Sequence, residues 1–295
     1  MIKDLKAVFH AEKYPLPILD EKADPLQCWQ DRRHWFLANL AHLAYYNEND
    51  IRETIIKLGG HSKYFDSDGT QAYLAEWDDM AVLAFRGSQP MERIDSINFR
   101  VSGFFGDVRD VLKGQKKFTG IFSAIFKYST PFTPIEVLFN DVLADANIVK
   151  VPLSDGAMVH KGFLKELDDI WNQISSKIEA VGKQKSLWVT GHSLGAALAT
   201  LAGTRFPFEK VVTFGEPRVG SNIGKVFKSK QHIRYVNGKD IVPQVPPEWL
   251  DGYQHHGKLE PLSYPKKETQ NQEESVIKTL DLLYDHSILN YMENL

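Results

Sequence analysis

The sequence predicts an α/β protein with a mostly parallel central sheet flanked by helices. Short apolar runs with strand character alternate along the chain with longer segments in which apolar residues recur at helical spacing. Such alternation is typical of parallel strands covered by helices on both faces. The chain has 295 residues, 43% of them hydrophobic, and this length is near the upper size for one core. We therefore expect a single domain over residues 1–295.

Composition and charge exclude several other classes of protein. The 35 basic and 38 acidic residues leave a net charge of −3, which gives no electrostatic reason to expect a nucleic-acid partner. Cys28 is the only cysteine, so an intramolecular disulfide and a cysteine-based metal cluster are excluded, and we expect its side chain to be buried. No stretch approaches 18 consecutive apolar residues, so no transmembrane helix is expected. The N-terminus lacks a signal-peptide core, which predicts a soluble protein, either cytoplasmic or exported by an unrecognised or removed signal.

Before residue 186, two helices and a hairpin are predicted. Residues 27–46 carry apolar side chains at intervals that indicate a helix with one buried face. Residues 71–77 and 80–85 are apolar-rich runs separated by two aspartates, which predicts a β-hairpin. Residues 162–181 repeat apolar side chains at helical spacing and are predicted to form the second helix.

Residues 186–202 form the clearest unit in the sequence. Residues 186–190 form a short apolar strand, residues 191–195 a tight turn, and residues 196–202 a helix of small side chains. Two more strands are predicted at 210–214 and 232–236. Strands that alternate with helical segments in this way are typical of a parallel sheet.

Two further helical segments are predicted. Residues 223–229, between the last two strands, resemble a helix. Residues 276–292 place apolar side chains on one side at helical spacing, which predicts a C-terminal helix.

The turn at 191–195 has the pattern Gly-x-Ser-x-Gly. Alone this pattern is a weak signal, but a strand precedes it and a helix follows, as a nucleophile elbow requires. The strained turn leaves no room for larger side chains two positions either side of the serine. Ser193 is therefore the predicted nucleophile, and the amide of Leu194 at the helix N-terminus is placed to stabilise negative charge.

A serine nucleophile needs a histidine base and an acid that orients it. After Ser193, the acids near strand ends are Glu216, Asp240 and Asp251. Asp240 follows the strand at 232–236 and its turn, and ligands of open α/β sheets bind at the carboxyl ends of strands. Position in the chain therefore favours Asp240.

Spacing leaves the base open among the histidines that follow the elbow. His232 starts a strand and so lies at the wrong end of the sheet. His255 and His256 lie in a predicted loop, and His286 follows an apolar run. The choice is divided between His286 and the 255–256 pair.

Six short motifs in order resemble the class 3 lipases, the fungal-lipase-like branch of the α/β-hydrolases. They are FRGS at 85–88, VHKGF at 159–163, VTGHSLG at 189–195, VTFGEPRVG at 212–220, NGKDIVP at 237–243 and DH at 285–286. The resemblance spans roughly residues 35–292 and implies an α/β-hydrolase fold. Unlike secreted fungal members of the family, this chain has no pair of cysteines to form a disulfide.

The resemblance implies roles for five residues. It makes Ser193 the nucleophile, Asp240 the acid and His286 the base, and so decides between the candidate histidines. It also implies an oxyanion hole formed by the backbone amides of Ser88 and Leu194.

Three other residues in or near these motifs are given supporting roles. Glu216 stands where the family motif is variable and is taken as structural. His160 and His192 belong to motifs and are expected to pack beneath the site. No cofactor is implied, and no metal, because His255 and His256 are adjacent and cannot form the i, i+4 pair of a helical zinc site.

Residues 89–139 form an insertion at the place where the lid emerges in the family. It contains eight of the 17 Phe residues of the chain. Phe118, Phe122 and Phe126 are at helical spacing, with lysines nearby. We expect a large helical lid that covers an apolar groove in water and meets a lipid–water interface. The alternative is that these side chains extend the core.

The resemblance implies a serine hydrolase, a triacylglycerol lipase or carboxylesterase. It would cleave glyceride esters of the triacylglycerol type through an acyl-enzyme, with a lipid or ester as its partner. A phospholipase A1 or a short-chain esterase is the alternative within enzymes. A lipase-like binding or signalling domain without catalysis is the alternative from another class, and intact Ser193, Asp240 and His286 argue against it.

Overall fold

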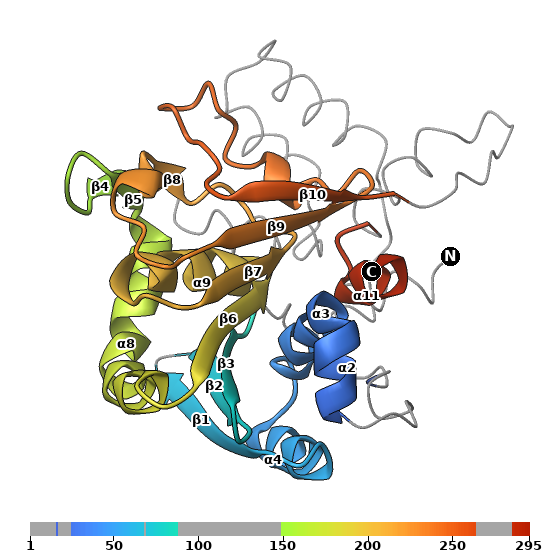
Figure 1. Ribbon diagram of the computed structural model, residues 1–295. Coiled ribbons are helices and arrows are strands. Elements are labelled where there is room, and N and C mark those ends of the chain that lie inside the picture. Colours follow the sequence, from blue (N-terminus) through green and yellow to red (C-terminus); the bar gives the residue numbers. More distant parts are fainter. Residues whose placement is uncertain (1–15, 17–24, 68, 88–148, 264–284) are drawn as a thin grey trace, which may run out of the picture.

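The computed structural model describes residues 16, 25–67, 69–87, 149–263 and 285–295, and a seven-stranded sheet lies at its centre (Figure 1). The strand order is β1-β2-β3-β6-β7-β9-β10. The first three strands pair antiparallel, and the strands from β3 to β10 all pair parallel. The strands are β1 (His61–Ser67), β2 (Thr70–Glu76), β3 (Met80–Phe85), β6 (Ser186–His192), β7 (Lys210–Phe214), β9 (His232–Asn237) and β10 (Lys258–Leu262). The prediction of a mostly parallel sheet is confirmed.

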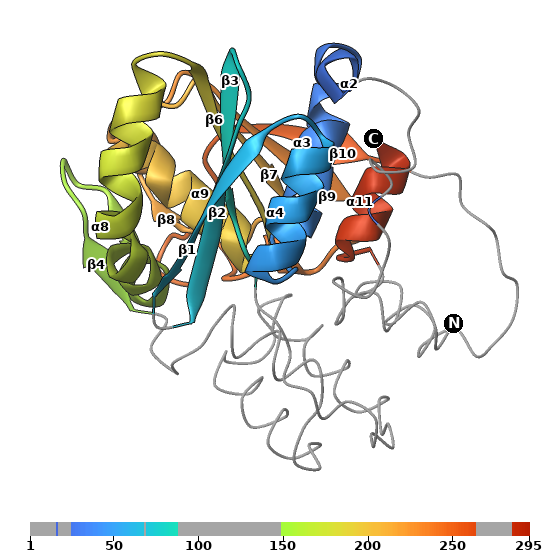
Figure 2. The same cartoon turned by 90° about the horizontal axis from the view of Figure 1, so that it is seen from below.

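Helices cover both faces of this sheet (Figure 2). Two long helices, α8 (Lys161–Gly182) and α9 (Leu194–Arg205), pack on one face. The other face is covered by α2 (Pro25–Asp31), α3 (Arg33–Leu43), α4 (Glu48–Lys57) and α11 (Ile288–Asn294). Each layer buries its own hydrophobic cluster against the sheet, so the core is divided in two by the strands.

A second, small sheet lies beside α8. Its strands are β4 (Lys150–Pro152), β5 (Met158–His160) and β8 (Gly220–Ser221), all antiparallel. β5 leads directly into α8, whose first turn is capped by His160 through its Nδ1 atom, 3.4 Å from the Phe163 amide. His160 thus caps α8, and its ring packs against Phe163.

Several predicted elements are confirmed. The hairpin is β2 and β3, the helix at 162–181 is α8, and the strands at 210–214 and 232–236 are β7 and β9. Cys28 is buried. Within the described ranges, no helix combines the length and apolarity needed to cross a bilayer.

Three predicted helices differ from the structure. The helix at 27–46 is two helices, α2 and α3, and α3 is buried on nearly every side because it lies between the sheet and its neighbouring helices. The segment at 223–229 forms only one 3₁₀ turn, Ile223–Lys225. The C-terminal helix begins at Ile288, after a turn that contains His286, and residues 264–284 lie outside the described ranges.

Candidate active site

Ser193 lies in a strained turn between β6 and α9. Its backbone has φ 59° and ψ −125°, a conformation that non-glycine residues rarely adopt. A side chain at Gly191 would overlap the Gly195 carbonyl, and one at Gly195 would overlap the Phe85 carbonyl on β3. The two glycines of the motif are thus required by close backbone contacts, as the sequence predicts.

The N-terminus of α9 faces the same turn. Leu194 is the first residue of the helix, and Ser193 stands at the N-cap position without a side-chain capping bond. The amides of a first helical turn have no partner within the helix and carry the positive end of its dipole. The turn therefore places backbone donors next to the serine side chain.

Asp240 and His286 form a buried pair at the carboxyl end of the sheet. The His286 Nδ1 atom lies 3.0 Å and 2.9 Å from the two carboxylate oxygens of Asp240. Asp240 follows β9 and His286 precedes α11, so two loops far apart in the sequence hold the pair. The remaining bonds of the carboxylate come from the Val242 amide at 2.9 Å and the Tyr291 hydroxyl at 2.6 Å.

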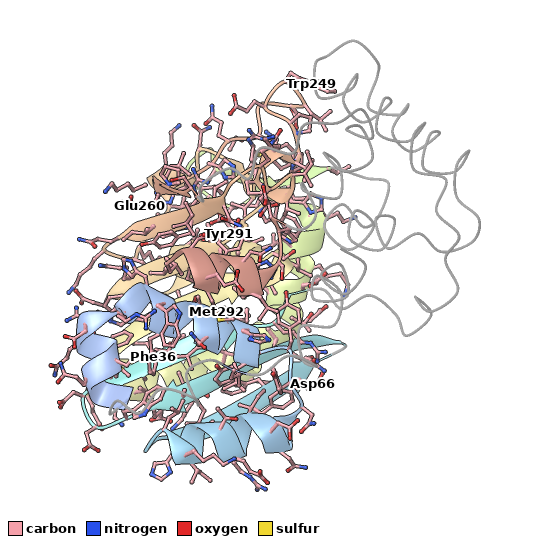
Figure 3. The ribbon with its side chains drawn as sticks, turned by 90° about the vertical axis from the view of Figure 1, so that its right-hand side faces the viewer. Phe36, Asp66, Trp249, Glu260, Tyr291 and Met292 are labelled. Atoms are coloured by element: carbon pink, nitrogen blue, oxygen red, sulfur yellow. The ribbon has the colours of Figure 1, made fainter. Side chains whose placement is uncertain are left out.

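Tyr291 belongs to α11, which lies between α3 and β9 (Figure 3). Burial raises the pKa of the Tyr291 hydroxyl well above its usual value, and the neighbouring Asp240 carboxylate raises it further. The hydroxyl therefore stays protonated and donates to Asp240. No sequence pattern indicates this contact, because it depends on how α11 docks.

Among the buried atoms that have no hydrogen-bond partner within the described residues, two belong to the candidate site residues. They are the Ser193 Oγ atom and the His286 Nε2 atom, and both are buried. The Ser193 amide donates to the Phe214 carbonyl at 3.0 Å, and a Cβ at the next residue, Gly215, would lie 2.9 Å from the Asp240 carboxylate and from the His286 ring. Ser193, Asp240 and His286 are thus all gathered around the end of β7.

His192 packs beneath His286, as predicted from its place in the motif. The two ring centroids are 4.6 Å apart, and His192 Nε2 lies 2.7 Å from the His286 carbonyl oxygen. On its other side, His192 Nδ1 lies 2.8 Å from the Tyr45 hydroxyl. Burial lowers the pKa of His192 well below its usual value, so the ring is neutral.

The other candidate bases lie apart from Asp240. The Nε2 atom of His255 is 2.7 Å from the Pro243 carbonyl oxygen. His256 contacts His232, which in turn contacts Glu216. Glu216 is buried among these side chains, in agreement with a structural role.

The remaining acid candidate is at the surface. Asp251 has φ 54° and forms an ion pair with Lys150 at 3.5 Å. Ser88, Phe118, Phe122, Phe126 and the whole insertion at 89–139 lie outside the described residues.

The described part of the chain also contains a cavity away from these residues. It has a volume of about 450 Å³ and is lined by side chains that include Leu153, Arg205 and Phe227. Arg205 ends α9, whereas Ser193 precedes its first residue, so the length of the helix separates the cavity from the elbow. In the ranges that the structure describes, no cluster of three or more His, Cys, Asp or Glu side chains is arranged to hold a metal ion.

A protein-family model matches more than half of the chain. The family described as Lipase (class 3) matches residues 82–249. The match begins within β3 and includes the elbow and Asp240.

Comparison with curated proteins gives distant, partial matches. Toxin TseL of Vibrio cholerae is 24% identical over 208 residues, which cover 64% of this chain and 30% of the toxin. Secreted mono- and diacylglycerol lipase 1 of Fusarium solani is 36% identical over 111 residues, 34% of this chain and 33% of that protein. Phospholipase A(1) DAD1 of Arabidopsis thaliana is 35% identical over 112 residues, 32% of this chain and 25% of that protein. The chain thus spans between a quarter and a third of the length of these relatives.

Solved structures with a similar fold include fungal lipases. The native Rhizomucor miehei lipase propeptide complex aligns with a TM-score of 0.52 at 19% identity. The alignment covers 90% of this chain and 79% of the lipase chain. At this identity the likeness concerns the fold, and it agrees with a mostly parallel sheet flanked by helices.

Proposed function

Since this chain belongs to the class 3 lipase family of hydrolases, we propose that it cleaves glyceride esters of the triacylglycerol type through a serine acyl-enzyme. One observation carries the proposal. The buried Asp240–His286 pair, at 2.9 Å, leaves His286 Nε2 without a partner at the sheet edge where Ser193 Oγ also has none. An imidazole with one nitrogen held by a carboxylate and the other open is suited to act as a general base.

In the first half of the proposed reaction, Ser193 Oγ attacks the ester carbonyl while His286 Nε2 takes its proton. Asp240 accepts a hydrogen bond from the Nδ1–H of His286, fixes the tautomer and stabilises the imidazolium. The Leu194 amide and the dipole of α9 stabilise the oxyanion. We assign the second oxyanion donor to the Ser88 amide.

The second half releases the products. His286 returns its proton to the departing alcohol, which breaks the ester bond and leaves the acyl group on Ser193. It then takes a proton from water, whose oxygen attacks the acyl-enzyme carbonyl. His286 passes that proton to Ser193 Oγ as the bond between the serine and the acyl group breaks and the carboxylic acid is released. The buried position of Asp240 and His286 supports this role, because a low dielectric strengthens the pairing of imidazolium and carboxylate.

The proposed preference for acyl-chain length rests on the insertion at 89–139. We assign it as a lid, with Phe118, Phe122 and Phe126 toward the acyl chain, and this favours long-chain glycerides at a lipid–water interface. A phospholipase A1 activity is the second candidate, because a relative named as such aligns with this chain.

A fluorophosphonate probe, which reacts with activated serines, tests the chemistry. We expect it to label the wild type, and we expect Ser193→Ala to abolish labelling and to lower p-nitrophenyl ester turnover by at least about 10⁴-fold with an unchanged circular dichroism spectrum. A wild type that is neither labelled nor active on any ester would support the non-catalytic alternative.

A substrate series tests the ester class. Rates on triacylglycerols of increasing chain length, and on a diacyl phospholipid, are measured below and above substrate aggregation. A rate that rises at aggregation and is greatest on long-chain triacylglycerol is expected. Greater turnover of the phospholipid, or of short soluble esters, would assign one of the alternatives instead.

A further inference from the structure

A chain of hydrogen bonds runs from Tyr45, which is far away in the sequence, to the backbone of His286. Tyr45, which follows α3, places its hydroxyl 2.8 Å from His192 Nδ1, across 147 positions of sequence. His192 Nε2 then lies 2.7 Å from the His286 carbonyl oxygen. All three side chains are buried.

The direction of each bond follows from the groups involved. A carbonyl oxygen only accepts, so His192 Nε2 must carry a proton and donate it to His286. Burial and the neighbouring His286 hold the pKa of His192 well below its usual value, so its Nδ1 atom has no proton. Tyr45 must therefore donate to His192 Nδ1, and one tautomer of His192 satisfies both contacts.

We propose that Tyr45 and His192 are positioning residues that fix the backbone and the ring of His286, and so direct its Nε2 atom at Ser193. The inference rests on the proposed function, in which His286 is the base and Ser193 the nucleophile. The His192 ring packs against the His286 ring at 4.6 Å with an interplanar angle of 33°, while its Nε2 proton holds the carbonyl of the same residue. One side chain thus restrains both the position and the tilt of the proposed base.

Neutrality matters to this arrangement. His286 becomes an imidazolium during the proposed reaction, and a charged His192 at this distance would oppose that change. The Tyr45 hydroxyl occupies the only nitrogen of His192 that could take a second proton. Burial keeps the supporting ring neutral, and the Tyr45 hydroxyl orients it.

Tyr45 also contacts the segment after β3. A Cβ at Gly87 would overlap the Tyr45 hydroxyl and would lie 2.6 Å from the His192 carbonyl oxygen. This close packing leaves the hydroxyl little freedom to turn away from His192. The contact also explains why glycine stands at position 87.

Kinetics separate positioning from general stabilisation. We expect Tyr45→Phe to lower kcat about tenfold and His192→Leu about a hundredfold, each with KM within about twofold of wild type. His192→Gln keeps one amide donor and one acceptor and should recover part of the loss. Tyr73→Phe is the matched control, because it removes a buried tyrosine hydroxyl bond of 2.8 Å, to Leu40 on α3, away from His286. Equal kcat in His192→Leu and Tyr73→Phe would overturn the proposal.

Nuclear magnetic resonance tests the same arrangement without turnover. In ¹⁵N-histidine-labelled protein we expect His192 to remain in the neutral Nε2–H tautomer from pH 5 to 9. The Nδ1 proton signal of His286 should shift or broaden in Tyr45→Phe and stay in place in Tyr73→Phe. A titrating His192, or an unchanged His286 signal in Tyr45→Phe, would refute the positioning role. An inactive, unlabelled wild type with these signals would refute only the proposed function.

Discussion

Two buried carboxylate–imidazole pairs lie beside the strands β7 and β9, and they differ in what surrounds the histidine. Asp240 and His286 are 2.9 Å apart, and Glu216 and His232 are 3.1 Å apart. All four side chains are almost completely buried. By distance and burial alone, either pair could belong to a catalytic triad.

The ring nitrogens separate the two pairs. His232 Nδ1 lies 3.1 Å from His256, and its Nε2 atom lies near Glu216 and two threonine hydroxyls, Thr200 and Thr213, each at 3.3 Å. Thr213 itself donates to Glu216 at 2.5 Å. Both nitrogens of His232 are thus occupied, whereas the open nitrogen is on His286.

The comparison teaches that an acid–histidine pair by itself indicates no reaction. Catalysis needs a histidine nitrogen left free, a hydroxyl on a strained turn, and a helix N-terminus beside it. The first pair lies next to such a turn at Ser193, and the second is sealed between α9 and the strands β7 and β9.

Replacing each acid by its amide gives the largest expected difference between the two pairs. Asp240→Asn should lower kcat by about 10³ to 10⁴-fold, because the amide no longer holds the reactive tautomer of His286. Glu216→Gln should leave kcat within about threefold of wild type. Steady-state kinetics on a p-nitrophenyl ester measure both. A dead Glu216→Gln beside a fully active Asp240→Asn would assign the reaction to the other pair.

Replacing the histidine of each pair should affect stability in the opposite order, with the larger loss at the Glu216 pair. His232→Leu leaves the buried Glu216 carboxylate without its imidazole, which should cost about 3 kcal/mol in the free energy of unfolding. His286→Leu should cost less, because Asp240 keeps bonds from the Val242 amide and the Tyr291 hydroxyl. Urea unfolding of both variants measures the difference, and a larger loss in His286→Leu would contradict the comparison.

The loop that contains His255 and His256 should make the protein sensitive to acid. Burial, together with Arg234, lowers the pKa of His255 to about 4, and burial, together with His232, lowers that of His256 to about 4. Below pH 6.5 these histidines bind protons in the unfolded chain but not in the folded protein. Their contribution to stability is therefore fully present above that pH and is lost as the pH falls toward 4. For His255 the loss is at most about 3 kcal/mol.

Unfolding by urea at pH 7, 5.5 and 4.5 measures this loss. His255→Gln keeps a donor for the Pro243 carbonyl but does not titrate, so its free energy of unfolding should fall less steeply over this range. A slope equal to that of wild type would mean that other groups cause the acid sensitivity.

Much of the fold could be predicted because it depends on local pattern. The apolar strands, the hairpin and the glycines around Ser193 are all visible in short windows of sequence. The general base cannot be predicted in this way, because spacing alone does not distinguish His286 from His255 and His256. Only the family resemblance decided between them, and in the structure Asp240 pairs with His286.

The remainder could not be predicted because it arises from packing between distant segments. Apolar spacing over 276–292 cannot show that Asp285 and His286 form a turn and that α11 begins only at Ile288. Tyr45 and Tyr291 have no motif, and their hydroxyls find His192 and Asp240 only after α3 and α11 dock on the sheet.

Tyr291→Phe should have the smallest effect on activity. It removes the hydroxyl that donates to Asp240 at 2.6 Å, yet the carboxylate keeps His286 and the Val242 amide. We expect kcat to fall about threefold and the free energy of unfolding by about 1.5 kcal/mol, the value of a hydrogen bond to a charged group. Tyr253→Phe is the control, because the buried Tyr253 hydroxyl has no partner in the described ranges, and its loss should change neither quantity. A hundredfold fall in Tyr291→Phe would instead mean that Asp240 depends on the Tyr291 hydroxyl to orient His286.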